Sequence, residues 1–458
     1  MIRIFKHYVP KSLFALGMFE TLLLFAAVEI GYRRRIFEID STVLPVLDRL
    51  PENLTFVMVN YVAMLALGLY QFSCCRSFRV SALRLAVALS FSFIVLSVIF
   101  FIYPDVLIWR SILFYSFVLA FILILVARWF FTRVADLDRF KKRVVVLGGG
   151  ERASRLCDAE QQNYHITDFI RMTPNETAVD RAIERDAIPS LTEFLAERQI
   201  SEIVLAMQER RGRLPTEALV AAKLRGVGIV DFTTFLERET GRVDLETLSP
   251  SWLIFSDGFV SAGTLNGFFK RTFDVVASLT LLMFSLPVLI FTALGIKLTS
   301  PGPVFFKQER VGYLGRVFSV YKFRSMRNDA EKDGPQFAQE KDPRVTPIGR
   351  LIRSTRIDEI PQIINVLRGD MSFVGPRPER PVFVDQLAAE IPYYRERHMM
   401  KPGITGWAQL NYPYGASIED ARHKLEYDLY YVKNYTIFLD LLILVQTVRV
   451  IFWQDGVR

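Results

Sequence analysis

The chain is poor in the residues that build metal centres and covalent cross-links. Its 458 residues include only three cysteines and four histidines. They are Cys74, Cys75, Cys157, His7, His165, His398 and His423. The cysteines show neither zinc-site spacing nor a disulfide framework, and no His-Glu-x-x-His stretch occurs. We therefore expect a protein that faces a reducing compartment, and we interpret the histidines as structural or surface residues.

Motifs for nucleic-acid binding are also absent. The sequence contains no zinc-finger spacing, no RNA-binding signature and no basic heptad region. Its net charge is +8, but the arginines gather at the ends of apolar segments. That placement is typical of membrane topology signals and of contacts with anionic headgroups. We expect no nucleic-acid partner.

Long apolar segments are what the sequence has in excess. Hydrophobic residues make up 51% of the chain and its mean hydropathy is +0.25. Four apolar segments occupy the N-terminal third: residues 12–32, 54–72, 83–103 and 112–131. Each has about the 20 residues that a spanning helix needs. The first lacks a cleavage site, so we expect an uncleaved helix whose Glu20 and Glu29 face the bundle.

Flanking charges predict the orientation of these helices. Arg76 and Arg79 lie between the second and third segments, Arg84 lies at the start of the third, and Arg133, Lys141 and Lys142 follow the fourth. By the positive-inside rule, both ends of the bundle are then cytoplasmic. The three arginines at 33–35 oppose this orientation.

The composition changes at Lys141. The stretch KKRVVVLGGGERASRL is typical of a strand, a glycine turn and a helix start, with Gly148, Gly150 and Ala153 in a GxGxxA frame. Strand-like runs at 202–206 and 227–232 alternate with helical runs at 191–198 and 215–225, which predicts a doubly wound α/β domain over residues 140–260. No acidic residue ends the second strand, and Asp168 lies inside an apolar run. We interpret the domain as structural or regulatory, with Gly148 and Gly150 as its only candidate cofactor contacts.

A fifth apolar segment, Val275–Ile296, has basic residues at both ends. Lys270 precedes it and Lys297 follows it, so both ends carry the charge that belongs in the cytoplasm. Pro287 should break the helix near its centre, where Ser285 can satisfy a freed carbonyl. We predict a re-entrant segment over about 270–297. The alternative is a kinked helix that spans the membrane.

Near the C-terminus, the apolar run Ile437–Trp453 is interrupted by Asp440, Gln446 and Arg449. These polar residues would be costly in the middle of a bilayer. We therefore predict an interfacial helix rather than a spanning one.

The stretch from Arg353 to Arg380 carries the chemistry. It combines the carboxylate pair Asp358–Glu359, the Pro-Arg-Pro turn around Arg377 and five arginines. Carboxylates can attack phosphorus or hold Mg²⁺, and arginines neutralise phosphate oxygens. Next to an apolar segment, this combination suits chemistry on a phosphate ester carried by a lipid. The structural alternative makes Asp358 a helix N-cap, with Pro361 in the first turn and Gly369 as the stop.

From about Phe268 onward the sequence resembles the bacterial sugar transferase family, the polyprenyl-phosphate hexose-1-phosphate transferases. The matching blocks are SPGPVFFKQERVGYLGRVFSVYKFRSM, IDEIPQIINVLRGDMSFVGPRPE and KPGITGWAQLN. The resemblance implies a multi-domain membrane protein of the family's long form. It would have a four-helix transmembrane bundle (1–135), the α/β Rossmann-like middle domain (140–260) and a mostly helical monotopic catalytic domain (266–458) with the re-entrant helix.

The resemblance also implies the reaction and the roles of several residues. Such enzymes move a sugar 1-phosphate from a nucleoside diphosphate sugar to a polyprenyl phosphate. Asp358 would be the nucleophile that forms an aspartyl-phosphosugar intermediate, and Asp358 and Glu359 would hold Mg²⁺. The phosphate-binding candidates are Arg353, Arg377, Lys322 and Arg324.

By the same resemblance, we expect a bacterial cytoplasmic membrane protein with its catalytic domain on the cytoplasmic face. A homodimer is compatible with the sequence, and the sugar is not readable from it. The resemblance makes glucose or galactose the default and leaves N-acetylated and trideoxy sugars open. One rival is a membrane-anchored nucleotide-sugar dehydratase, but no tyrosine has a lysine four residues on. The others are a non-catalytic scaffold and a multi-pass transferase. A scaffold would require that the Asp358–Glu359 pair be broken, and a multi-pass enzyme would require more apolar segments than this sequence has.

Overall fold

The computed structural model describes residues 1–39, 43–71, 74–75, 77–134, 141–158, 163–209, 212–248, 258–259, 264–330, 342–413, 415 and 417–453. The chain divides into two compact units. One unit comprises Met1–Ile4 and Tyr8–Thr247, and the other comprises Phe5–His7 and Leu248–Arg458. We describe each unit separately.

Four apolar helices follow a short N-terminal hairpin, as the sequence predicts. The hairpin pairs β1 (Ile2–Ile4) with β2 (His7–Val9), and the helices are α1 (Lys11–Ile39), α2 (Leu50–Ala66), α4 (Phe78–Ile102) and α5 (Arg110–Val134). Single 3₁₀ turns, η1 (Val46–Arg49) and η2 (Pro104–Val106), precede α2 and α5. Helices α1, α4 and α5 are long and apolar enough to cross a membrane. Helix α2 has 17 residues.

The two acidic residues predicted to face the bundle, Glu20 and Glu29 of α1, both have basic partners. The Glu20 carboxylate is fully buried and lies 2.7 Å from the guanidinium of Arg128 on α5. Glu29 lies 2.9 Å from Arg49, whose side chain is also buried. Pairing offsets the cost of burying each charge, so the prediction that both acids face the bundle is confirmed.

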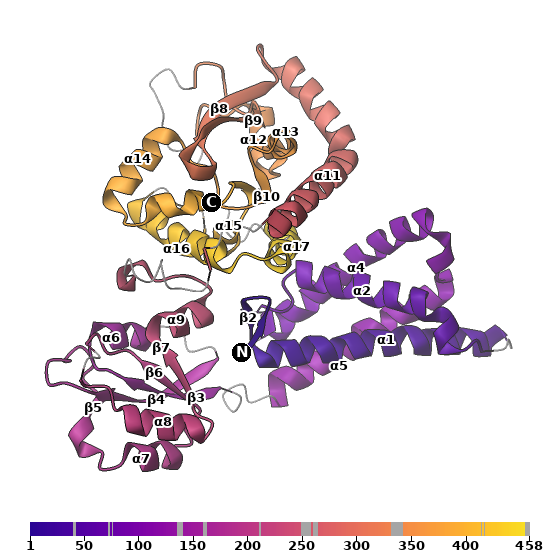
Figure 1. Cartoon of the computed structure of the whole chain (residues 1–458). Helices are drawn as coiled ribbons and strands as arrows, with labels where there is room; N and C mark the ends of the chain where they lie inside the picture. Colours follow the sequence, from indigo (N-terminus) through magenta and orange to yellow (C-terminus); the bar gives the residue numbers. More distant parts are fainter. Residues whose placement is uncertain are drawn as a thin grey trace. The chain divides into compact units, whose positions relative to one another are not determined.

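The middle of the chain forms the predicted doubly wound sheet. Five parallel strands run in the order β5-β4-β3-β6-β7. They are β3 (Lys142–Leu147), β4 (Tyr164–Arg171), β5 (Ile183–Glu184), β6 (Glu202–Leu205) and β7 (Gly228–Asp231). Helices α6 (Glu151–Asp158) and α9 (Phe232–Thr240) cover one face, and α7 (Leu191–Glu197) and α8 (Thr216–Leu224) cover the other (Figure 1). The 3₁₀ turns η3 (Arg185–Ala187) and η4 (Leu245–Thr247) complete this unit.

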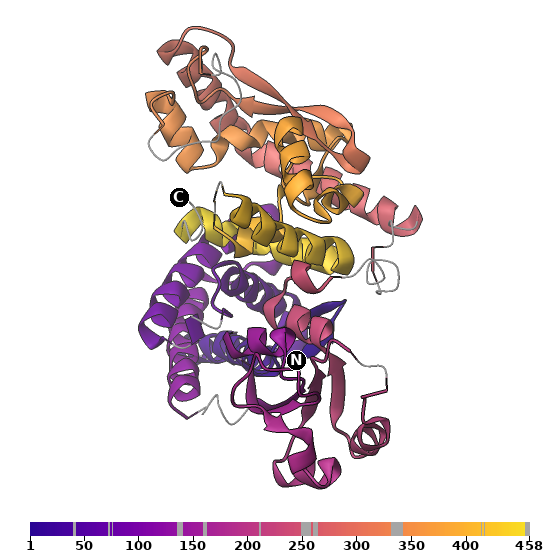
Figure 2. The same ribbon diagram turned by 90° about the vertical axis from the view of Figure 1, so that its left-hand side faces the viewer.

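The second unit is mostly helical, but it also contains a long antiparallel ribbon. The ribbon pairs β8 (Phe305–Val311) with β9 (Val317–Phe323) around the turn η5 (Tyr313–Gly315) (Figure 2). The short strands β10 (Ser372–Val374) and β11 (Gly403–Thr405) pair in parallel. The remaining elements are α11 (Thr264–Thr299), α12 (Pro347–Ser354), η6 (Ile357–Gln362), α13 (Ile363–Arg368), α14 (Pro381–Glu390), η7 (Tyr394–Met399), α15 (Trp407–Asn411), α16 (Ile418–Asn434) and α17 (Ile437–Trp453).

Helix α11 contains the predicted re-entrant segment. The backbone is helical on both sides of Pro287 and through it, so the predicted break is absent, but the course of the helix bends along its length (Figure 1). The Ser285 hydroxyl makes no hydrogen bond with the residues that the structure describes. The prediction that Ser285 satisfies a freed carbonyl is therefore wrong, and neighbouring turns must accommodate the proline.

Both ends of α11 are fastened within the second unit. At its start, the guanidinium of Arg271 donates to the carbonyl oxygens of Val366 and Leu367. Near its end, Ile296 is buried against Phe323 of the ribbon. Between these anchors the helix carries many exposed apolar side chains.

Residues Phe5–His7, which form the turn of the N-terminal hairpin and the first position of β2, group with the second unit. The ring of Phe5 lies 5.7 Å from that of Phe438, and His7 Nδ1 lies 3.0 Å from the Tyr430 hydroxyl. The His7 ring also meets Trp407 edge-on. Burial lowers the pKa of His7 to about 4, so the imidazole is neutral near pH 7. His7 is a structural residue, as expected.

Candidate active site

The short helix η6 carries the carboxylate pair. Arg356 adopts a left-handed conformation (φ 59°) that turns the chain from α12 into η6. Asp358 and Glu359 follow in the first turn, 9% and 7% exposed. The N-cap of η6 is Arg356 and no side chain caps this helix, so the N-cap interpretation of Asp358 is wrong. Gly369 (φ 93°) does end the following helix, α13, as predicted.

Glu359 is held between two cations. Lys322 Nζ on the ribbon donates to Glu359 Oε1 at 2.9 Å, and Arg377 Nη2 donates to the same oxygen at 2.8 Å. Burial raises the pKa of Glu359, but the charges of Arg377 and Lys322 outweigh it and hold this pKa well below its usual range. Glu359 is therefore an anion throughout the physiological pH range.

Asp358 is in a different electrostatic environment. Burial, followed by the neighbouring charge of Glu359, raises the pKa of Asp358 to about 6, although Lys322, Arg356 and Arg353 act in the opposite direction. Its carboxylate takes part in no hydrogen bond or ion pair with the described side chains. A mostly buried carboxylate with free lone pairs is suited to nucleophilic attack.

A buried ion pair anchors the Pro-Arg-Pro turn. Arg397 Nη2 donates to the carbonyl oxygen of Arg377 at 3.0 Å and lies 2.7 Å from Asp428 Oδ2. Arg397 Nη1 donates to the Tyr394 hydroxyl at 2.7 Å. Burial raises the pKa of Asp428 to about 6, against the effect of Arg397. The pair fixes the backbone from which Arg377 reaches Glu359.

A cavity of about 950 Å³ lies beside the dyad. Its charged lining residues are Arg356, Glu359, Arg377, Glu379, Glu390, Arg397, Lys424 and Asp428. Most of the remaining lining is apolar and comes from α11, α14, α15 and α17. The cavity therefore joins an anion-binding region to hydrocarbon-like walls, which suits substrates that combine phosphate with apolar groups.

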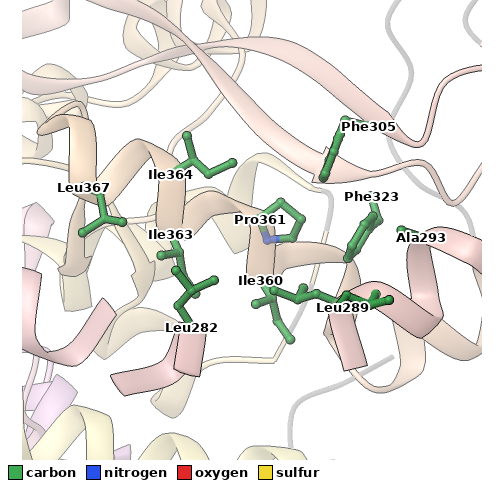
Figure 3. A pocket seen from close by; sticks show the side chains of 11 residues that line it. Leu282, Leu289, Ala293, Phe305, Phe323, Ile360, Pro361, Ile363, Ile364 and Leu367 are labelled. Carbon is green, nitrogen blue, oxygen red and sulfur yellow. The ribbon is translucent and has the colours of Figure 1, made fainter. Parts of the chain in front are cut away.

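A second cavity, of about 260 Å³, lies in the same unit and is lined only by apolar side chains. Figure 3 shows Leu289 and Ala293 of α11 on the side of the stacked rings of Phe305 and Phe323, and Leu282 of the same helix below Ile363, with Pro361 of η6 in the middle of the view. The other lining residues are Ile290, Ile360, Ile363, Ile364 and Leu367. Ile360, next to Glu359, lines both cavities.

The structure brings together some of the predicted phosphate-binding residues and leaves others apart. Lys322 and Arg377 meet at Glu359. Arg324 instead donates to the carbonyl oxygens of Ser300 and Pro301, where it closes the end of α11. Arg324 lines neither cavity, and its role as a phosphate ligand stays a prediction that none of its described contacts supports. Arg353 contributes charge near Asp358 but does not line either cavity.

Arg397 and Asp428 were not predicted from the sequence. Their partners lie far apart in the sequence, so spacing could not reveal the pair. One signal was available: Asp428 stands among the apolar and aromatic residues of LEYDLYY. A carboxylate in such a run needs a buried cation.

The dyad is chemically suited to Mg²⁺. Magnesium typically takes one or two carboxylates and completes its shell with water and substrate phosphates. The free carboxylate of Asp358 and Oε2 of Glu359 could supply the protein's share. Among the described residues, no cluster of three acidic, histidine or cysteine side chains offers an all-protein site.

The glycine turn of the middle domain is filled by the chain itself. Gly149 N and Met172 N both donate to Glu176 Oε2 at 3.0 Å, and Val179 N donates to the Gly149 carbonyl. The carboxylate thus satisfies a turn donor of the kind that binds pyrophosphate in dinucleotide-binding domains. Arg171, not an acid, ends the second strand and pairs with Glu184. Asp168 pairs with Arg198.

Comparisons with known proteins identify the class of enzyme. Residues 265–454 match the family model for bacterial sugar transferases, and residues 65–214 match that of a CoA-binding domain. The "Uncharacterized sugar transferase EpsL" of Bacillus subtilis (strain 168) is 43% identical over 189 residues, which are 41% of this chain and 90% of that protein. The chain belongs to the bacterial sugar transferase family.

Two longer matches extend toward the N-terminus. The UDP-N-acetylgalactosamine-undecaprenyl-phosphate N-acetylgalactosaminephosphotransferase of Aeromonas hydrophila is 45% identical over 240 residues, 52% of this chain and 56% of that protein. The UDP-glucose:undecaprenyl-phosphate glucose-1-phosphate transferase of Xanthomonas campestris is 32% identical over 335 residues, which are 68% of this chain and 66% of that protein. The chain therefore matches somewhat more than half the length of the first and about two thirds of the second.

Proposed function

We propose that this protein transfers a hexose 1-phosphate from a uridine diphosphate sugar to undecaprenyl phosphate and releases UMP. One observation carries the proposal: a buried, unbonded Asp358 carboxylate stands beside Glu359, which Lys322 and Arg377 hold as an anion. The family match and the activities of the relatives support this reaction rather than that of a dehydratase.

In the first half-reaction, an oxygen of Asp358 attacks the phosphorus atom that carries the sugar. The bond from that phosphorus to the oxygen bridging the two phosphates breaks, and UMP leaves with the electron pair. Arg356 and Arg377 line the cavity and can stabilise the charge that accumulates on the phosphate oxygens. When bound by Asp358 and Glu359, Mg²⁺ would neutralise further phosphate charge.

In the second half-reaction, an oxygen of the lipid phosphate attacks the same phosphorus. The bond to Asp358 breaks, the carboxylate is regenerated and the lipid-linked sugar diphosphate leaves. A covalent intermediate lets a soluble donor and a membrane acceptor use one site in turn. The Arg397–Asp428 pair keeps the Pro-Arg-Pro turn in place through both steps.

The re-entrant course of α11 is part of the proposal. A straight helix of its length would extend ~54 Å, well beyond the hydrocarbon thickness. Its two ends instead contact the same unit, Arg271 at α13 and Ile296 at the ribbon. With basic residues at both ends, these anchors support a helix that enters and leaves by the cytoplasmic face of the bacterial inner membrane.

The test is a panel of uridine diphosphate sugars with undecaprenyl phosphate, followed by UMP release and by the lipid product. The panel includes UDP-glucose, UDP-galactose and UDP-N-acetylgalactosamine, because the named relatives act on glucose or N-acetylgalactosamine. We expect one donor to yield UMP and lipid-linked sugar diphosphate in equal amounts. A keto-sugar product, or no UMP from any donor, would contradict the proposal.

A further inference from the structure

We infer that the wall of the large cavity formed by α11 and α17 binds the isoprene units next to the phosphate of the acceptor. This inference rests on the proposed function, since it assigns the second substrate to one part of the same cavity. The wall comprises Ala277, Thr280, Leu281 and Phe284 of α11 with Leu444 and Val448 of α17.

These α11 residues share one face of the helix. They follow the i, i+3, i+4, i+7 spacing that places side chains in a row. The same cavity is lined by Arg356, Glu359 and Arg377. A ligand in it can therefore place a phosphate at the arginines while an attached hydrocarbon lies along α11.

The opposite faces of α11 are apolar as well. Leu279 and Met283 are 51% and 63% exposed, and neither lines a described cavity. The segment Gly267–Thr299 is apolar and long enough to enter a membrane. The helix that lines the cavity therefore also presents apolar side chains on its outer face, as a helix in contact with hydrocarbon would.

The wall suits the acceptor better than the donor. A nucleotide sugar carries hydroxyl and carbonyl groups that lose water when they are buried and need protein partners in return. On α17, the Thr447 hydroxyl is already occupied by Thr405 and by the Ile443 carbonyl. Apart from Thr280, the other side chains of the wall are apolar and offer no hydrogen bond, so sugar or base would bind there at a cost, whereas hydrocarbon would not.

The smaller cavity is the rival location for the isoprene units. It also borders α11 and shares Ile360 with the large cavity (Figure 3). No charged side chain lines it, so a lipid there would have its phosphate outside that cavity. For this reason we place the acceptor in the large cavity and use the small one as an arm of the test.

The test separates the two half-reactions of the full-length enzyme in nanodiscs. Exchange of labelled UMP into the accepted uridine diphosphate sugar needs no lipid and reports the first half-reaction. The KM for undecaprenyl phosphate and for farnesyl phosphate reports the second. Ala277→Trp places a bulky side chain in the cavity beside the wall. Leu279→Trp, on the same helix but outside the cavity, is the matched control.

We expect Ala277→Trp to keep UMP exchange near the wild-type rate and to raise both acceptor KM values by about tenfold or more. The KM for farnesyl phosphate should rise as much as that for undecaprenyl phosphate, because the wall contacts the isoprene units next to the phosphate. Val448→Trp on α17, with Leu441→Trp as its control, repeats the test if Ala277→Trp fails to fold.

Three results would overturn the inference. Acceptor KM values equal to those of the controls would mean that the wall does not contact the lipid. Loss of UMP exchange in both wall variants but not in the controls would assign the wall to the donor. A raised acceptor KM only in Ala293→Trp would assign the lipid to the smaller cavity. Absence of UMP exchange in the wild-type enzyme would instead reject the proposed function itself.

Discussion

The two adjacent carboxylates of η6 are tuned in opposite directions. Burial and a like charge raise the pKa of Asp358 to about 6, while Lys322 and Arg377 hold that of Glu359 well below its usual range. Glu359 is thus ion-paired with Lys322 and Arg377, whereas the Asp358 carboxylate retains free lone pairs. This difference supports the proposal that Asp358 attacks and that Glu359 organises charge.

Replacement of the nucleophile tests this assignment. We expect Asp358→Asn to lower phosphosugar transfer by about a thousandfold or more, because an amide is not an anionic nucleophile. Glu359→Gln should also be severely impaired, through the loss of the ion pairs at Lys322 and Arg377. UMP release and the melting temperature are measured together. A well-folded Asp358→Asn with near-normal turnover would eliminate the covalent mechanism.

The raised pKa of Asp358 predicts an acid limb in the rate profile. Only the ionised carboxylate attacks, so the rate of UMP exchange should fall about tenfold per pH unit below about pH 6. The charge of Arg356 favours the ionised form, so Arg356→Gln should raise this pKa and move the limb to higher pH. A limb that stays in place, or moves to lower pH, would contradict this electrostatic account.

At the scale of elements, the glycine turn of the middle domain is closed by its own loop. Because Glu176 satisfies Gly149 N and Met172 N, we expect no saturable binding of NAD to the wild-type protein. Glu176→Ala leaves both donors without their acceptor and should cost about 1–3 kcal/mol of stability. Glu176→Gln keeps an acceptor oxygen and should cost less. Equilibrium dialysis and thermal unfolding measure these effects, and NAD binding that pyrophosphate displaces would contradict the expectation.

Helix α11 provides a second test at this scale. We predict that Pro287→Leu straightens the helix, favours a spanning orientation and lowers transfer, because the substitution removes the residue that bends α11 between its two anchors. Single cysteines just after Lys297 are labelled from either side in a background without Cys74, Cys75 and Cys157. Labelling from the periplasmic side in the protein that retains Pro287 would reject the re-entrant course.

Local sequence patterns predicted helices and strands well, but they did not predict which of these elements contact one another. The strands of the parallel sheet read as short apolar runs, so β6 and β7 begin within a residue of their predicted starts. The segment around Pro287 was predicted as two helices with a break, whereas α11 continues through the proline and only bends. Pairs such as Arg397 and Asp428 join distant segments, and no local period records such a partner.

At the scale of the molecule, the C-terminal unit includes part of the N-terminal hairpin. We still expect a protein that begins near residue 260 to catalyse transfer, because Lys322, Asp358, Glu359 and Arg377 are all retained. It lacks Phe5 and His7, however, which cover Phe438, Trp407 and Tyr430.

The shortened protein should therefore melt at a lower temperature than the full chain. UMP release and thermal unfolding are measured in nanodiscs, with full-length His7→Ser as the matched control for the missing contact. A folded C-terminal unit that releases no UMP from an accepted donor would show that the N-terminal portion contributes directly to the chemistry.

The docking of His7 on Tyr430 also imposes an order of events during synthesis. The two residues are 423 positions apart, so the ribosome completes the first long before it completes the second. Until Trp407 and Tyr430 have been made, the His7 imidazole lacks both of these aromatic neighbours. The N-terminal hairpin can therefore complete its packing only late in synthesis, which departs from the N-terminal-first order of folding that is general for multidomain proteins.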